Sequence, residues 1–218
     1  MRLAIPVALL IASAPGAASP SVAGPTPVAP GSKPLLTDII PIDLRPGTNA
    51  VPGFLPGGGT ATIVEAWRGN GNAHGHRAWM VLTGESEGNP VGLAPIRHAD
   101  GDTFDDTIAD SPFDGERVLG AARFVRATLA GKPASLFVSA DLDWTDGRPL
   151  ADHELATVSV FRLTANDEGI GPPMAFVRVA RVRGDKRYCN AELALRDVLG
   201  VPLPADYSGP NKVDGCFG

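Results

Sequence analysis

Several features that assign a chain to a broad class are scarce or missing here. No hydrophobic run reaches the roughly 20 residues that a membrane-spanning helix requires, so we expect no transmembrane segment. Basic side chains number 19 against 24 acidic ones, for a formal net charge of -5, which disfavours a nucleic-acid partner. No internal repeat is visible, so solenoids and propellers are disfavoured as well.

Cysteine is also scarce: the chain has 2, Cys189 and Cys216. Redox pairs usually have the spacing Cys-x-x-Cys, whereas these two are far apart in the sequence. In an oxidising compartment an even pair most often forms one disulfide, which for a loop of this size stabilises by about 3.5 kcal/mol in the chain-entropy model. We therefore predict a Cys189–Cys216 disulfide that ties the C-terminal segment to the domain.

The N-terminal residues have the pattern of a secretory signal. Arg2 precedes the apolar run Leu3–Ala12, and the small residues beyond it place Ala18 and Ala23 where cleavage is allowed. We expect residues 1–23 to be a signal peptide and the protein to be exported, to the periplasm or the extracellular space.

The rest of the chain divides into a leader and one domain. Residues 24–59 are rich in proline and glycine, with an apolar segment, Leu35–Leu44, that we interpret as an arm docked at a sheet edge, where Pro41 is tolerated. Pro46–Gly59 is predicted to be loose. Residues 60–218 are long enough for one β-rich domain.

Turn signals divide this domain into strands. The clearest hairpin is Arg123–Ala130 with Ala134–Asp143, because apolar residues alternate along both segments. A helix is predicted after Asn190, its N-cap, and ends at Gly200. Other predicted strands are Thr60–Arg68, Arg77–Thr83, Val91–Arg97, Thr157–Thr164 and Met174–Arg183. The sequence thus predicts an α+β, β-rich fold: a single mainly antiparallel domain, sandwich- or barrel-like, with one C-terminal helix.

The pair His74 and His76 is the main candidate metal site. Residues two apart in an extended strand point to the same side, so both imidazoles could bind zinc, copper or iron. A third ligand is needed, and His98 is a candidate; Asp100 and Asp102 are alternatives. The other interpretation is that one histidine bonds the adjoining turn and the other faces solvent. The sequence itself assigns no cofactor.

Two further patterns match known sites only in part. Gly84-Glu85-Ser86-Glu87-Gly88 fits the G-x-S-x-G nucleophile elbow, but the prolines and glycines that follow exclude the helix that such an elbow needs. We therefore predict a turn and no nucleophile at Ser86. Asp100–Glu116 carries seven acidic side chains and no basic one before Arg117, yet lacks EF-hand spacing, which favours a solvated extended loop over a calcium site.

Two groups of side chains could serve as binding surfaces. Arg181 and Arg183 share a strand face, where they could bind an anion, a partner or the acidic loop. Trp67 or Trp79 could form a contact surface together with the docking arm. These patterns favour a non-catalytic exported binding or envelope-associated module for an unknown protein or small-molecule ligand. The alternative is a metal-dependent enzyme that uses His74 and His76.

Overall fold

The computed structural model describes residues 35–71, 75–84, 91–110, 113–114, 117–143, 153–166, 169 and 171–205. Within them the elements follow one another from β1 to η2, where η1 is a single 3-10 turn and η2 a π-helical turn that continues α1. Their bounds are β1 Leu36–Pro41, β2 Gly47–Val51, η1 Pro56–Gly58, β3 Ala61–Arg68, β4 His76–Thr83, β5 Gly92–Leu93, β6 Ile96–Arg97, β7 Phe104–Asp105, β8 Ile108–Ala109, β9 Phe113–Asp114, β10 Arg117–Val118, β11 Gly120–Leu129, β12 Lys132–Leu142, β13 Glu154–Ala165, β14 Met174–Tyr188, α1 Ala191–Ala194 and η2 Leu195–Leu199.

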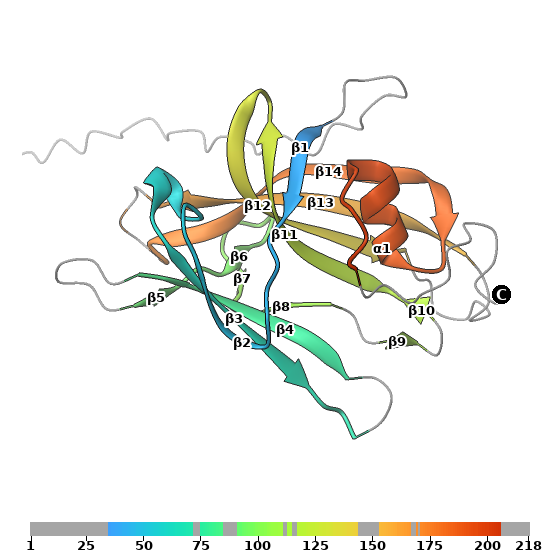
Figure 1. Cartoon of the computed structure of the whole chain (residues 1–218), viewed down its shortest axis with the longest axis horizontal. Coiled ribbons are helices and arrows are strands. Elements are labelled where there is room, and N and C mark those ends of the chain that lie inside the picture. Colours follow the sequence, from blue (N-terminus) through green and yellow to red (C-terminus); the bar gives the residue numbers. More distant parts are fainter. Residues whose placement is uncertain are drawn as a thin grey trace, which may run out of the picture.

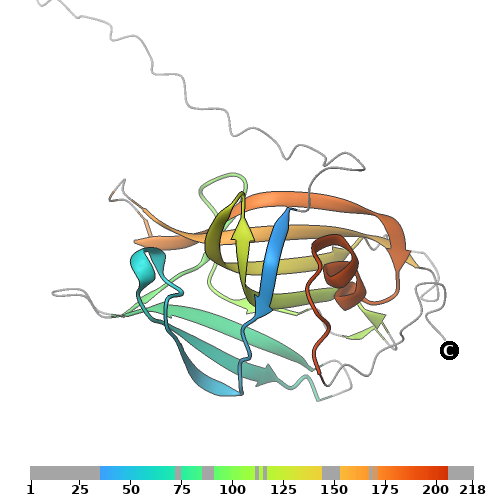
Figure 2. The same ribbon diagram turned by 45° about the horizontal axis from the view of Figure 1, so that its top comes forward.

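Two mainly antiparallel sheets face each other. The larger has the strand order β1-β11-β12-β13-β14-β6-β7, and the smaller is β2-β3-β4-β5 with β8 paired to β4. Figures 1 and 2 show the sheets as separate layers, with α1 against the larger one. The predicted α+β, β-rich architecture is confirmed, in the form of a sandwich with a helix on its outer side.

The predicted hairpin is β11 and β12. Leu129 pairs with Lys132, which leaves a two-residue turn whose members both have positive φ, 50° at Ala130 and 79° at Gly131. Such turns match the right-handed twist of paired strands. The turn is tighter than expected, because Pro133 already lies in the strand, paired with Thr128.

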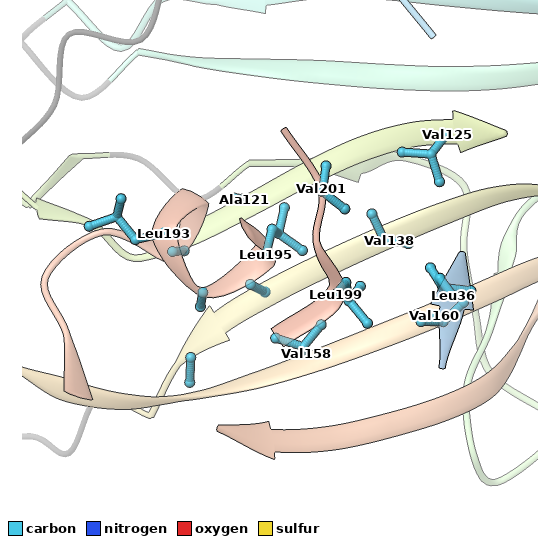
Figure 3. Packing of buried hydrophobic residues seen from close by; sticks show 14 of the residues in the cluster. Leu36, Ala121, Val125, Val138, Val158, Val160, Leu193, Leu195, Leu199 and Val201 are labelled. Atoms are coloured by element: carbon cyan, nitrogen blue, oxygen red, sulfur yellow. The ribbon is translucent and has the colours of Figure 1, made fainter. Parts of the chain in front are cut away.

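The larger sheet is covered on both faces at its centre. On one face β12 and β13 pack against α1 and η2, whose Leu193, Leu195 and Leu199 belong to the same buried cluster as Val138 and Val158; Figure 3 shows Leu199 beside Val158 and Leu193 beside Ala121. The N-cap of α1 is Asn190, whose side chain accepts from the backbone of the first turn, and Gly200 ends η2 with φ 81°. Burial on both faces explains why Ala156–Phe161 is a continuous buried run rather than an alternating one.

The opposite face packs against the smaller sheet through a second core of aromatic rings. Phe137 is 3% exposed, and its centroid lies 5.7 Å from Phe124, 5.1 Å from Phe161 and 5.9 Å from Phe176. Trp79 of β4, also 3% exposed, closes this core from the smaller sheet. Trp79 is therefore a core residue, which excludes it as a contact surface and leaves Trp67 of the two predicted alternatives.

The N-terminal segments are more ordered than their composition suggested. The apolar arm is β1, which pairs with β11 at the edge of the larger sheet. The stretch Pro46–Gly59, predicted to be loose, contains β2, which pairs along its length with β3. The expected strand Val91–Arg97 is divided between the two sheets as β5 and β6, and the acidic segment that follows contains β7 and β8.

Candidate functional site

A cleft of about 1070 Å³ opens beside the β11–β12 turn. Three segments form its walls: the η1 loop (Gly53–Gly58), the tip of the β11–β12 hairpin (Arg126–Ser135) and the end of β13 (Arg162–Thr164). Asp38 of β1 also lines it. We call it the hairpin cleft. In Figures 1 and 2 η1 lies at the left and α1 at the right, with the β11–β12 hairpin between them. Its volume suits a small organic ligand.

The η1 loop is held in place as a wall. Phe54 is 2% exposed, with its ring 5.9 Å from Phe124 and 6.2 Å from Phe176. Arg126 Nη2 donates to the Pro52 carbonyl at 2.5 Å, and Ser135 Oγ donates to the Gly53 carbonyl at 3.2 Å. Because an aromatic anchor and two hydrogen bonds fix the loop, the cleft exists before a ligand binds.

The hairpin cleft combines positive charge with apolar surface. Arg126, Lys132 and Arg162 line it, and within the described residues none of the three forms an ion pair. Among the described residues of its walls Asp38 is the one carboxylate, so these four charges sum to an excess of positive charge in a chain of net charge -5. Phe54, Leu55, Leu129 and Leu163 supply apolar lining. This combination suits an anion that carries an apolar group.

A second hollow of about 640 Å³ adjoins the first. It lies between the end of β1 with the β1–β2 connection, Ile40–Pro46, and β2 with the residue after it, Thr48–Pro52, and we call it the turn hollow. Arg126 lines both spaces. The side chains of Asp43, Arg45 and Thr48 make its walls more polar than those of the hairpin cleft.

A buried charge cluster lies at the opposite end of β11. Glu192 of α1 forms an ion pair with Arg123 of β11, and its Oε1 is 3.9 Å from Nη2 of Arg77 on β4. Arg77 also binds Asp110 through its Nε at 2.8 Å and stacks over Trp79. Burial raises the pKa of the Glu192 carboxyl, while Arg123 and Arg77 oppose that rise. The cluster links the helix to both sheets, so we interpret it as structural.

The candidate metal ligands are not assembled in the described part of the chain. His76 lies on β4 opposite Arg68, and His98 Nε2 is 2.7 Å from Asp105 Oδ2. No group of three or more His, Cys, Asp or Glu side chains among the residues described could hold a metal ion. His74 lies outside those residues, so the site of His74, His76 and His98 stays a prediction.

The predicted disulfide also remains a prediction. Cys189 is fully buried beside the first turn of α1, and Cys216 lies outside the described residues. We expect the protein purified from an oxidising compartment to resist thiol alkylation under denaturing conditions until a reductant is added. Alkylation of both cysteines without reductant would contradict this.

The other candidate residues fall in different surroundings. Ser86 lies outside the described residues, so its prediction as a turn residue stands untested. Trp67 is 66% exposed at the end of β3. Arg183 forms an ion pair with Asp143 at 2.7 Å, which occupies one of the two arginines predicted to bind an anion.

No helix in the described ranges has the length and apolar character needed to cross a membrane.

Sequence reasoning missed the residues of the hairpin cleft. In the sequence Arg126 is one polar residue on an alternating strand, and Lys132 follows a turn glycine without the further residues of a phosphate-binding loop. One signal was present: Arg126 follows Phe124 on the same strand face, so a charge there must lie at the margin of the core. Glu192, at the second position of a capped helix, gave no sign that it would be buried.

Comparison with known proteins supports the fold. The crystal structure of CarG is similar to this chain, with a TM-score of 0.59 and 17% sequence identity over 73% of this chain and 95% of CarG. No protein-family model and no curated protein matches the sequence. At this level of identity the likeness concerns the fold alone: the chain shares its β-rich architecture with CarG.

Proposed function

We propose that the protein is an exported, non-catalytic binding module that takes a small anionic, partly apolar molecule in the hairpin cleft. The observation that carries this proposal is the set of three cations without ion-pair partners among the described residues, placed around an apolar lining. A guanidinium without a carboxylate partner can form charge-assisted hydrogen bonds to a ligand carboxylate, sulfonate or phosphate.

Two of the three hydroxyl side chains that line the cleft are engaged in structural hydrogen bonds, which favours binding over catalysis. Ser135 donates to the Gly53 carbonyl, and Thr164 donates to the Arg162 carbonyl at 3.4 Å. A nucleophilic hydroxyl needs a base that removes its proton, whereas these two hydroxyl protons are bonded to backbone carbonyls. The third hydroxyl, that of Thr128, and the cations remain available to bind an anion.

The test uses 1-anilinonaphthalene-8-sulfonate, whose aromatic rings and sulfonate match the cleft. We expect saturable fluorescence enhancement at one site. The double variant Lys132→Gln/Arg162→Gln should weaken binding about tenfold, because it removes two charge-assisted contacts. Neither side chain forms an ion pair in the described residues, so the fold should be retained, as thermal melts would show.

The matched control is Arg68→Gln, which removes one exposed positive charge on the smaller sheet, outside the hairpin cleft. This variant should bind the dye like the parent protein. Equal affinities of the parent and the double variant, or fluorescence that does not saturate, would show that the hairpin cleft is not an anion site.

A further inference from the structure

We infer that the ligand is an elongated anionic amphiphile that extends across Arg126 from one hollow into the other. Its apolar end would lie in the hairpin cleft, its acidic group on the Arg126 guanidinium, and a polar end in the turn hollow. This inference rests on the proposed function, because it assigns the ligand class and orientation at the same site.

Arg126 and the backbone at Pro52–Gly53 form the boundary between the two spaces. Pro52 lines the turn hollow, Gly53 lines the hairpin cleft, and Arg126 lines both. The hydrogen bond from Arg126 Nη2 to the Pro52 carbonyl holds the guanidinium at this boundary. A ligand that occupies both spaces must therefore pass this side chain.

The guanidinium retains hydrogen-bonding capacity at that position. Arginine has five N–H donors, and in the described part of the chain the Arg126 side chain bonds the Pro52 carbonyl alone. Its side chain is exposed, so a ligand oxyanion can reach it. A phosphate or carboxylate group can accept two of the remaining donors at once.

The two hollows differ in chemistry in a way that orients the ligand. The hairpin cleft has Phe54, Leu129 and Leu163 among its walls, and burial of apolar ligand surface there is favourable. In the turn hollow, Asn49 bonds the backbone at Arg45, Gly47 and Ile63 and so keeps the turn in shape. Arg45 is exposed and forms no ion pair in the described residues, so it can bind a polar end.

An acyl chain joined through a phosphate to a polar alcohol has its groups in this order. The test compares three probes below their micelle concentrations by competition with the naphthalene dye: lauroyl lysophosphatidylglycerol, dodecyl phosphate and glycerol phosphate. We expect the lysophospholipid to bind at least tenfold more tightly than dodecyl phosphate, which lacks the polar end. Glycerol phosphate, which lacks the apolar end, should bind most weakly.

Two variants locate the ligand. Arg45→Gln should weaken the binding of the lysophospholipid about tenfold and leave the affinity for dodecyl phosphate unchanged. The reason is that Arg45 lines the turn hollow and not the hairpin cleft. Arg126→Gln should weaken both, and Arg68→Gln should affect neither.

Equal affinity for the two amphiphiles, with no effect of Arg45→Gln, would overturn the inference and leave the proposed function intact. Tightest binding of glycerol phosphate would also overturn it, in favour of a free phosphate ester. Absence of binding by all three probes while the dye binds would exclude an amphiphile. Absence of dye binding as well would refute the proposed function itself.

Discussion

Replacing Glu192 with Ala should lower the free energy of unfolding by about 3–5 kcal/mol, the range found when one partner of a buried ion pair is removed. The Glu192 and Arg123 side chains are 10% and 13% exposed, and Arg77 approaches the same carboxylate. The alanine variant removes the carboxylate that Arg123 pairs with and that Arg77 approaches, at the junction of β4, β11 and α1. Chemical denaturation followed by circular dichroism measures the loss.

The same carboxyl should make stability depend on pH in a defined direction. In the folded state burial raises the pKa of Glu192 above the ordinary value of about 4.5. Its contribution to stability is therefore fully present below that ordinary value and is lost as pH rises through the folded-state pKa. On lowering the pH from neutral towards about 4.5, the parent protein should gain stability relative to Glu192→Gln.

This pH dependence is tested by measuring the melting temperatures of the parent protein and Glu192→Gln across this range. Asp185→Asn, at an exposed position of β14, serves as the control and should follow the parent. A constant difference between the parent and Glu192→Gln at all pH values would show that Glu192 does not titrate differently in the folded state.

The second large effect is expected at the centre of the aromatic core. Phe137→Ala should cost about 3–5 kcal/mol, because it removes a buried ring and leaves a cavity between the sheets. Phe137 contacts rings from β11, β13 and β14, so no single neighbour can fill the space. Urea denaturation measures the difference in unfolding free energy.

Two controls separate the cavity from a general effect of truncation. Phe137→Leu should cost less, since it keeps most of the apolar volume. Val179→Ala, at a position 41% exposed, should change stability by less than about 0.5 kcal/mol. If Phe137→Ala were as mild as Val179→Ala, the ring would not be a central element of this core.

Elements with local signals could be predicted from the sequence. Alternation in β11 and β12 and the turn residue Gly131 define that hairpin within a few residues. Asn190 and Gly200 bracket the helix, because N-caps and left-handed C-terminal residues are set by nearby backbone geometry. These features need no knowledge of distant segments.

Pairings between distant segments could not be predicted in the same way. β2 has little apolar character of its own and is a strand because β3 offers it hydrogen-bonding partners. The hairpin cleft forms where the η1 loop, the hairpin tip and β13 come together, and no local sequence pattern predicts this tertiary arrangement. Likewise, the burial of Glu192 follows from where α1 packs and not from its own neighbours in sequence.

The edge position of β1 has a consequence for how the chain acquires its structure. Leu36 pairs with Leu129, so β1 can pair only after β11 has been synthesised. Closing the long loop between these two residues carries an entropic cost that slows the pairing. The β11–β12 hairpin can form first from local contacts and then serve as the template for the arm. Until the arm pairs, the edge of β11 is open and Leu36 is uncovered, and both features favour association with other chains.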